Sequence, residues 1–175
     1  MYGSRKSKHI YCIEADNQSF SDLKYNMEIN CEKNYTLINN AIYNKDDIEI
    51  KFGKNLFLKN SKMNDSTSHI YSDNNSNNTF DSYNLVRTIT LNSIIKKYDI
   101  NYNEISIIKV DIEGGEEHIL TELNYIHETY NIPIYISFHY DWWENKDLNR
   151  FEFLSEKNKD LIKHDPFTSI LLSTY

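Results

Sequence analysis

The sequence predicts an α/β protein in which helices flank a mostly parallel sheet. Short apolar stretches alternate with segments whose apolar residues recur at helical spacing, which is typical of this class. Three of the apolar stretches end in a polar residue, namely Glu14, Asp111 and His139. At 175 residues, with no internal repeat, the chain is expected to form a single domain over residues 1–175.

The first half is expected to contain three strands and one helix. A short polar side chain at Asp16 or Asn17 can cap the helix by accepting a bond from a free amide. Phe20, Leu23 and Met27 then form one apolar stripe at i, i+3 and i+7. The expected strands cover residues 9–13, 35–38 and 48–52.

A long variable loop is expected over about residues 54–85, because Asn, Ser and Asp dominate there and periodicity is lost. Loops of this length are either functional lids or disordered, and the sequence leaves both open. Order returns at Val86, with a helix that Thr88 or Thr90 can cap. This helix is expected near 91–98. The remaining expected elements are a strand at 105–110, a helix at 116–125, a strand at 132–138, a helix at 146–159 and a strand at 167–172.

Composition excludes several classes of function. The net charge of −7 disfavours binding to nucleic acid, whose backbone is also negative. No apolar run reaches the ~20 residues of a membrane span, and no signal peptide is recognisable. Cys12 and Cys31 fit no metal spacing and are expected to be free thiols. A cytoplasmic protein is expected.

The candidate site lies where strands end. The carboxyl ends of parallel strands share one edge of a sheet, so Glu14, Asp111 and His139 can converge there, and Asn40 follows a fourth strand. A carboxylate such as Glu14 can accept both hydroxyls of a ribose. Each residue also has a structural reading: the acids can cap the next helix, and His139 can be an ordinary near-surface histidine.

Asp111 and Glu113 are two residues apart. If the chain stays extended through Glu113, both side chains point to one side, where they could orient a hydroxyl, take its proton or hold a metal ion. Gly114 and Gly115 permit a sharp turn after them. Glu116 and Glu117 suit the first turn of the following helix, where negative charge is favoured.

Other chemistries have less support. No glycine-rich phosphate loop is present, which disfavours phosphoryl transfer and hydride transfer to NAD. A metal-dependent hydrolase using Asp111, Glu113, His139 and Asp141 is a distant alternative, because the spacing of these residues is unspecific for metal binding. The favoured interpretation therefore assigns no metal ligand. At least one of the adjacent residues Trp142 and Trp143 is expected to be partly exposed, where it could contact a ring-bearing substrate. The alternative is that these residues pack against a neighbouring helix.

Four segments resemble the FkbM family of S-adenosylmethionine-dependent methyltransferases. The strongest is Ile108-Lys109-Val110-Asp111-Ile112-Glu113-Gly114-Gly115-Glu116, which is similar to the family motif K-[IV]-D-[IV]-E-G-A-E. The others are Tyr11-Cys12-Ile13-Glu14-Ala15-Asp16, Leu37-Ile38-Asn39-Asn40-Ala41-Ile42 and Val86-Arg87-Thr88-Ile89-Thr90-Leu91, and Ile134 to His139 fits the strand after the motif.

The resemblance implies a Rossmann-like methyltransferase fold that uses S-adenosyl-L-methionine, often to methylate a hydroxyl of a sugar or other small molecule. It implies a catalytic group of Asp111, Glu113 and His139. The implied cofactor-binding residues are Glu14, Asp16, Asn40, Ala41 and Asp111.

The family also has a first strand and a glycine loop similar to D-x-G-A-N-x-G, and this chain begins near the family's second strand. An N-terminally truncated fold is therefore expected. The alternative function is an inactive or split-gene methyltransferase fragment. Such a fragment would act as an interaction module, pairing with a partner chain or a second copy through an exposed sheet edge.

Overall fold

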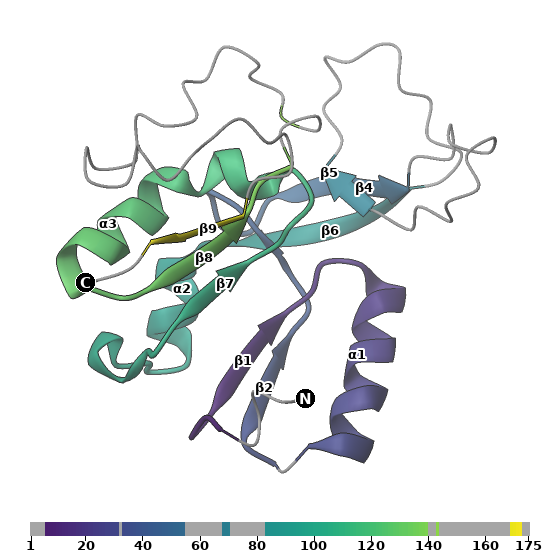
Figure 1. The fold of residues 1–175 in the computed structure, drawn as a ribbon. Helices are drawn as coiled ribbons and strands as arrows, with labels where there is room; N and C mark the ends of the chain where they lie inside the picture. Colours follow the sequence, from purple (N-terminus) through teal and green to yellow (C-terminus); the bar gives the residue numbers. More distant parts are fainter. Residues whose placement is uncertain are drawn as a thin grey trace.

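The computed structural model describes residues 6–31, 33–54, 68–70, 83–139, 143 and 169–172. These residues form a mixed α/β fold (Figure 1). The strands are β1(Ile10–Ile13), β2(Tyr35–Ile38), β3(Ala41–Ile42), β4(Glu49–Lys54), β5(Ser68–Ile70), β6(Tyr83–Ile89), β7(Ile108–Val110), β8(Ile134–Ser137) and β9(Ser169–Leu172). The helices are α1(Asn17–Asn30), α2(Leu91–Lys97) and α3(Leu120–Tyr130), with 3₁₀ turns η3(Tyr102–Glu104) and η4(Gly115–His118).

The strands of the described residues form three sheets rather than one. Their orders are β1-β2, β3-β6-β4-β5 and β7-β8-β9. The pairs β1–β2, β3–β6 and β7–β8 are parallel, as predicted, whereas β4–β5, β4–β6 and β8–β9 are antiparallel. The α/β class is thus confirmed, but the pairing is mixed instead of mostly parallel.

The unit β1-α1-β2 follows the sequence prediction closely. Asp16 is the N-cap of α1, and its carboxylate accepts the backbone N–H of Ser19 at 2.8 Å. Of the predicted apolar stripe, Met27 is fully buried, whereas Phe20 and Leu23 are half-buried. Figure 1 shows α1 beside the β1–β2 pair.

The predicted loop of residues 54–85 contains parts of two strands. β5 pairs with β4, matching Phe52 with Ile70, and β6 begins at Tyr83 and runs between β4 and β3. The prediction missed β5, β6 and the two-residue β3 because their strand character comes from pairing partners distant in sequence, not from a local alternating pattern. Residues 55–67 and 71–82 lie outside the described part.

The start of α2 is held by three side chains. Thr90 is the N-cap, as predicted, and accepts the backbone N–H of Ser93. Asp46 accepts the backbone N–H of Thr90 at 2.6 Å, and this bond is the main cause that holds the pKa of the Asp46 carboxyl below its ordinary value. Glu122 of α3 accepts the backbone N–H groups of Leu91 and Asn92. The start of α2 is therefore tied to both α3 and the segment before β4.

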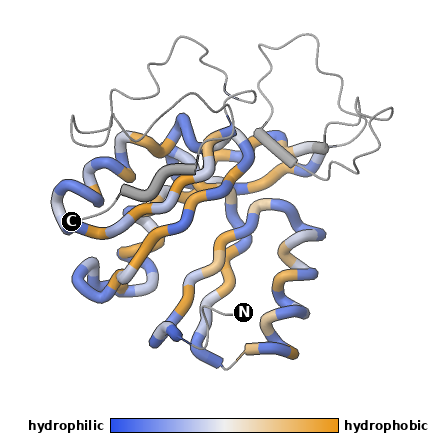
Figure 2. The backbone as a smooth tube through the Cα atoms, viewed as in Figure 1, coloured by the Kyte–Doolittle hydropathy of each residue, from blue (hydrophilic) through white to orange (hydrophobic). Residues whose placement is uncertain are grey.

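The segment from β7 to just beyond β8 contains the most deeply buried apolar side chains of the described residues. β7 is shorter than predicted, and the predicted helix at 116–125 divides into η4 and the longer α3. α3 ends at Asn131, which has a left-handed φ of 56°, and Pro133 follows. Figure 2 shows apolar residues along the central strands. The fully buried side chains include Ile119, Leu123, Ile126, Ile132, Ile134, Ile136 and Phe138.

The predicted strand at 167–172 is confirmed where it is described, as β9, which pairs antiparallel with β8. The predicted helix at 146–159 lies outside the described residues, as do Asp141 and Trp142.

Candidate active site

The chain turns sharply just after β7. Glu113 has a left-handed φ of 49°, and Gly114 follows with φ 94°. The extended conformation expected through Glu113 is therefore wrong, because the turn starts at that residue. Gly114 accommodates its positive φ without a steric penalty, and the N–H of Gly115 closes the turn on the carbonyl of Ile112 at 3.1 Å.

The carboxylate of Glu116 lies at the centre of this turn and is completely buried. Its oxygens accept the backbone N–H groups of Ile112 at 3.3 Å and of Gly114 at 3.1 and 3.2 Å. They also accept the indole N–H of Trp143 at 3.1 Å. A buried carboxylate is costly unless it is hydrogen-bonded, and here backbone and side-chain donors surround it.

His139, just beyond β8, is oriented by Glu116. Its Nδ1 lies 3.0 Å from Glu116 Oε1. An ionised carboxylate can only accept, so Nδ1 must carry the hydrogen and donate it. This bond fixes the ring and leaves Nε2 directed away from Glu116.

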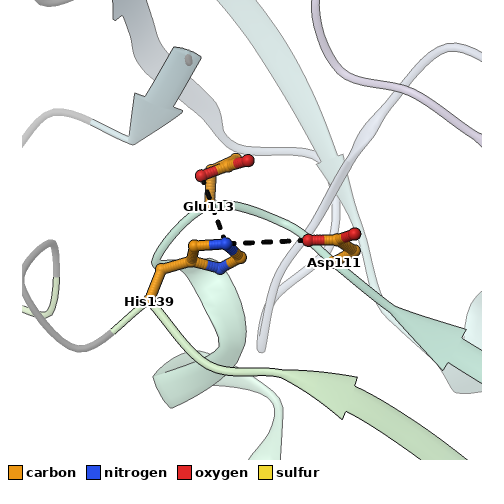
Figure 3. A group of neighbouring side chains, drawn as sticks. All are labelled: Asp111, Glu113 and His139. Carbon is orange, nitrogen blue, oxygen red and sulfur yellow. Dashed lines mark ion pairs between the residues drawn. The ribbon is translucent and has the colours of Figure 1, made fainter. Parts of the chain in front are cut away.

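The other ring nitrogen of His139 faces two carboxylates (Figure 3). Nε2 lies 3.4 Å from Glu113 Oε2 and 3.7 Å from Asp111 Oδ1. The hydrogen bond to Glu116 is the main cause that raises the pKa of His139, and the charges of Glu116, Glu113 and Asp111 add to it, whereas burial opposes the shift. His139 is therefore a stronger proton acceptor than an ordinary histidine.

An ion pair with Lys109 holds Oδ2 of Asp111, the carboxylate oxygen that does not face His139. Lys109 Nζ lies 2.8 Å from Asp111 Oδ2, and both side chains are substantially exposed. An exposed pair of this kind adds little stability. It does, however, leave Oδ1 as the oxygen that faces His139.

Glu14 and Asp16 lie together at the end of β1. Glu14 Oε1 accepts the backbone N–H of Asp16 at 2.8 Å, while the Asp16 carboxylate caps α1 and is buried. Among the described residues, no hydrogen bond occupies Glu14 Oε2. The side-chain amide of Asn39 donates to the carbonyl of Glu14 at 2.9 Å, which ties the ends of β1 and β2 together.

Asn40 lies in the link between β2 and β3, and Ala41 is the first residue of β3. The side-chain amide of Asn40 donates to the carbonyl of Arg87 in β6 at 3.0 Å, and Ala41 is buried against β6. Within the described ranges, no hydrogen bond or ion pair joins Glu14 or Asn40 to Asp111 or His139. The predicted catalytic residues Asp111, Glu113 and His139 thus meet directly. Of the predicted cofactor-binding residues, Asp111 belongs to this group, whereas the others lie at the end of β1 and the start of β3.

The two groups are connected through the hydrophobic core. Ile13, which precedes Glu14, packs against the same core cluster that contains Ile38 of β2 and Val110 of β7. Phe138, which precedes His139, belongs to that cluster too. The strands that end in Glu14, Asp111 and His139 therefore end around one shared core.

Sequence reasoning missed the importance of three residues. Glu116 was expected only as a first-turn charge, and Lys109 was given no role. Trp143 is 3% exposed and packs edge-on against Phe138, which follows β8 rather than lying on a helix, and its bond to Glu116 was not foreseen. The sequence held no local signal for the burial of Glu116, because an acidic residue in a first helical turn is equally expected at an exposed helix start.

Cys12 and Cys31 are free thiols, as predicted. Burial raises the pKa of the Cys12 thiol, which disfavours its reactive thiolate form. In the part of the chain that the structure describes, no helix combines the length and apolarity needed to cross a bilayer.

The described residues thus form a mixed α/β fold in which acidic residues and a histidine follow the ends of strands. A family model described as the methyltransferase FkbM domain matches residues 2–162. The chain therefore belongs to the FkbM methyltransferase family. No curated protein matches the chain, and no solved structure matches it.

We predict that Glu116→Gln lowers the pKa of His139 and destabilises the fold by ~1.5–3 kcal/mol, the scale of a hydrogen bond to a charged group. Because the wild-type pKa of His139 is raised, the His139–Glu116 pair stabilises the fold fully below pH 6.5 and loses this contribution as pH rises through the folded-state pKa. The destabilisation should therefore be largest at acidic pH, with a smaller pH-independent part from the lost backbone bonds.

NMR titration of His139 and urea unfolding at several pH values, both in chelator-treated buffer, measure the two effects. Glu128→Gln on the exposed face of α3 is the matched control. An unchanged His139 titration in Glu116→Gln would contradict the assignment.

Proposed function

We propose that this chain is an S-adenosyl-L-methionine-dependent O-methyltransferase whose acceptor is a hydroxyl of a sugar or another small molecule. We further propose that residues 1–175 form a single Rossmann-like domain. The observation that carries the proposal is the gathering of Asp111, Glu113 and His139 after β7 and β8, in a chain of the FkbM family. The core shared by the ends of β1 and β7 supports it.

The residues at the end of β1 fit the ribose of the cofactor. A ribose offers two neighbouring hydroxyl donors, and Glu14 offers carboxylate oxygens of which only Oε1 takes a bond within the described residues. Asn40 and Ala41 would lie near the adenine. Asp16 would act mainly through Glu14, since its own carboxylate is engaged as the cap of α1.

The catalytic group fits proton acceptance. When bound, S-adenosyl-L-methionine supplies a methyl group on a positively charged sulfur, which an acceptor oxygen takes as the carbon–sulfur bond breaks. The protein then has two tasks, to align the acceptor and to take its hydroxyl proton. Asp111 would orient the acceptor or the methionine end of the cofactor, and Glu113 or His139 would take the proton.

His139 suits this role only in its neutral form. Its Nδ1–H is fixed by Glu116, so the free electron pair lies on Nε2, on the side of Asp111 and Glu113. The raised pKa makes Nε2 a strong proton acceptor once neutral. Glu113, which is a third exposed at the side chain, is the alternative base.

A second candidate function is an interaction module that pairs through a strand edge. Among the described residues β1 bonds only to β2, and β7 only to β8. The backbone N–H groups of Ile10 and Glu14 donate to residues on the β2 side. Because successive N–H groups of a strand point to opposite edges, those of Tyr11 and Ile13 point to the other edge of β1. Free N–H groups at such an edge can pair with a partner chain or a second copy.

We predict that the chain binds S-adenosyl-L-methionine and that Glu14→Gln weakens binding by roughly 10- to 100-fold, the equivalent of one charge-assisted hydrogen bond. Isothermal titration calorimetry measures the affinity, and Glu28→Gln on the exposed face of α1 is the control. If the wild-type chain gives neither heat nor thermal stabilisation with millimolar cofactor, the proposed function is wrong.

We also predict that Glu113→Gln or His139→Gln lowers kcat by about 10²–10⁴, the usual contribution of a general base, with little change in cofactor affinity. The assay follows S-adenosylhomocysteine formation against a set of hydroxylated sugars and phenols. The variant with the larger loss identifies the base. Equal turnover by both variants and the wild type would remove the catalytic assignment.

The edge-pairing candidate predicts self-association or capture of a partner strand. Sedimentation velocity over a range of concentrations should show a dimer, which Tyr11→Pro should weaken because proline removes an N–H from the free edge of β1. A wild-type chain that stays monomeric and methylates an acceptor at full rate would exclude this candidate.

A further inference from the structure

Three acceptor atoms face one another in the catalytic group. Glu113 Oε2 and Asp111 Oδ1 carry negative charge, and neutral His139 presents an electron pair at Nε2. Atoms of this kind repel unless a positive charge lies between them. A proton on Nε2 is one solution, and a metal cation is another.

The separations suit a metal cation. One ligand atom from each of Asp111, Glu113 and His139 lies within 4.8 Å of the other two. His139 Nε2 lies 3.4 Å from Glu113 Oε2 and 3.7 Å from Asp111 Oδ1. If the two carboxylate oxygens are 4.8 Å apart, the largest separation within the group, a point equidistant from all three atoms lies about 2.4 Å from each. Bonds from divalent metals to nitrogen and oxygen ligands are about 2.0–2.2 Å, so only a small contraction is needed.

The surroundings hold two of these ligands in the orientation that a metal requires. Histidine ligands in metal sites donate their second N–H to a carboxylate, which fixes the ring and makes the ligand nitrogen more basic. His139 Nδ1 does this to the buried carboxylate of Glu116 at 3.0 Å. Lys109 holds Asp111 Oδ2 at 2.8 Å and leaves Oδ1 facing the site.

The local charge has the matching sign. Among the described residues of this contact network, Asp111, Glu113 and Glu116 contribute negative charges and Lys109 contributes a positive one. Three acids around one histidine favour a cation between them. The three ligands come from the turn after β7 and from the end of β8, and Figure 3 shows the carboxylates of Asp111 and Glu113 directed toward the ring of His139.

We propose that Asp111, Glu113 and His139 form a binding site for a divalent cation, with Glu116 as the residue that positions His139. Carboxylate oxygens suit Mg²⁺, Ca²⁺ and Mn²⁺, whereas an imidazole nitrogen suits transition metals, so Mn²⁺ is the cation that we take as the probe of this mixed ligand set. Water or a hydroxyl oxygen of the acceptor would occupy its open positions. Cation binding rests on the geometry alone, whereas its use to hold the acceptor rests on the proposed function. With the cation bound, Glu113 and His139 would be its ligands rather than the base, and a cation-bound hydroxyl of the acceptor would lose its proton to water.

The experiment uses the full chain after chelator treatment and follows Mn²⁺ binding by electron paramagnetic resonance of the free ion. We expect one Mn²⁺ per chain, with at least tenfold weaker binding in Glu113→Gln and His139→Gln. Glu116→Gln should weaken binding by about 10- to 100-fold, the usual effect of losing such an outer partner. Glu128→Gln should bind as the wild type does. Wild-type protein that leaves Mn²⁺ free, or variants that bind it unchanged, would overturn the proposal.

A second measurement does not depend on how well the variants fold. In the wild-type complex, pulsed spectroscopy should detect nitrogen coupled to the bound Mn²⁺, as expected for an imidazole ligand, and its absence would exclude His139 as a ligand. Calorimetry with S-adenosyl-L-methionine, with and without Mn²⁺, separates the two proposals. Cofactor binding in chelator without any Mn²⁺ site refutes only the cation site, and Mn²⁺ binding without cofactor affinity refutes only the methyltransferase.

Discussion

The buried carboxylate of Glu116 is the interaction on which the site depends. It gathers donors from the turn after β7, from His139 and from Trp143, so it joins three segments that are separated in sequence. A carboxylate with no exposed surface would destabilise the fold if these donors were absent. The geometry that satisfies it therefore also determines where Asp111, Glu113 and His139 lie.

The same constraint gives the proposed catalytic group its chemistry. Because Glu116 takes the hydrogen of His139 Nδ1, the opposite nitrogen is the one presented to Asp111 and Glu113. That nitrogen can carry a proton or an electron pair, and the two acids favour a positive charge beside it. A general base and a cation ligand are thus alternative states of one arrangement, and a proton and a divalent metal would compete for it.

The core explains how strand ends that are distant in sequence come to border one apolar cluster. Ile13, Val110 and Phe138 lie one residue before Glu14, Asp111 and His139, and all three contribute to the same hydrophobic cluster. Burying the last apolar residue of each strand brings the polar residue that follows it to the margin of that cluster. The hydrophobic effect is not directional. By burying the apolar residues it nevertheless positions the neighbouring polar residues, whose hydrogen bonds and ion pairs depend on the orientation of their side chains.

The sequence by itself determined the elements whose signals are local. Asp16 and Thr90 are caps because short polar side chains bond to amides three residues away, and β1, β2 and β8 are short apolar runs. The motif around Asp111 indicated the family and the catalytic group. Tertiary structure decided what depends on distant partners: the strands β5 and β6, the division into three sheets, the left-handed turn at Glu113 and the burial of Glu116. An isolated glutamate carries no mark of burial in its sequence, because the donors that make burial tolerable come from residues as far away as His139 and Trp143.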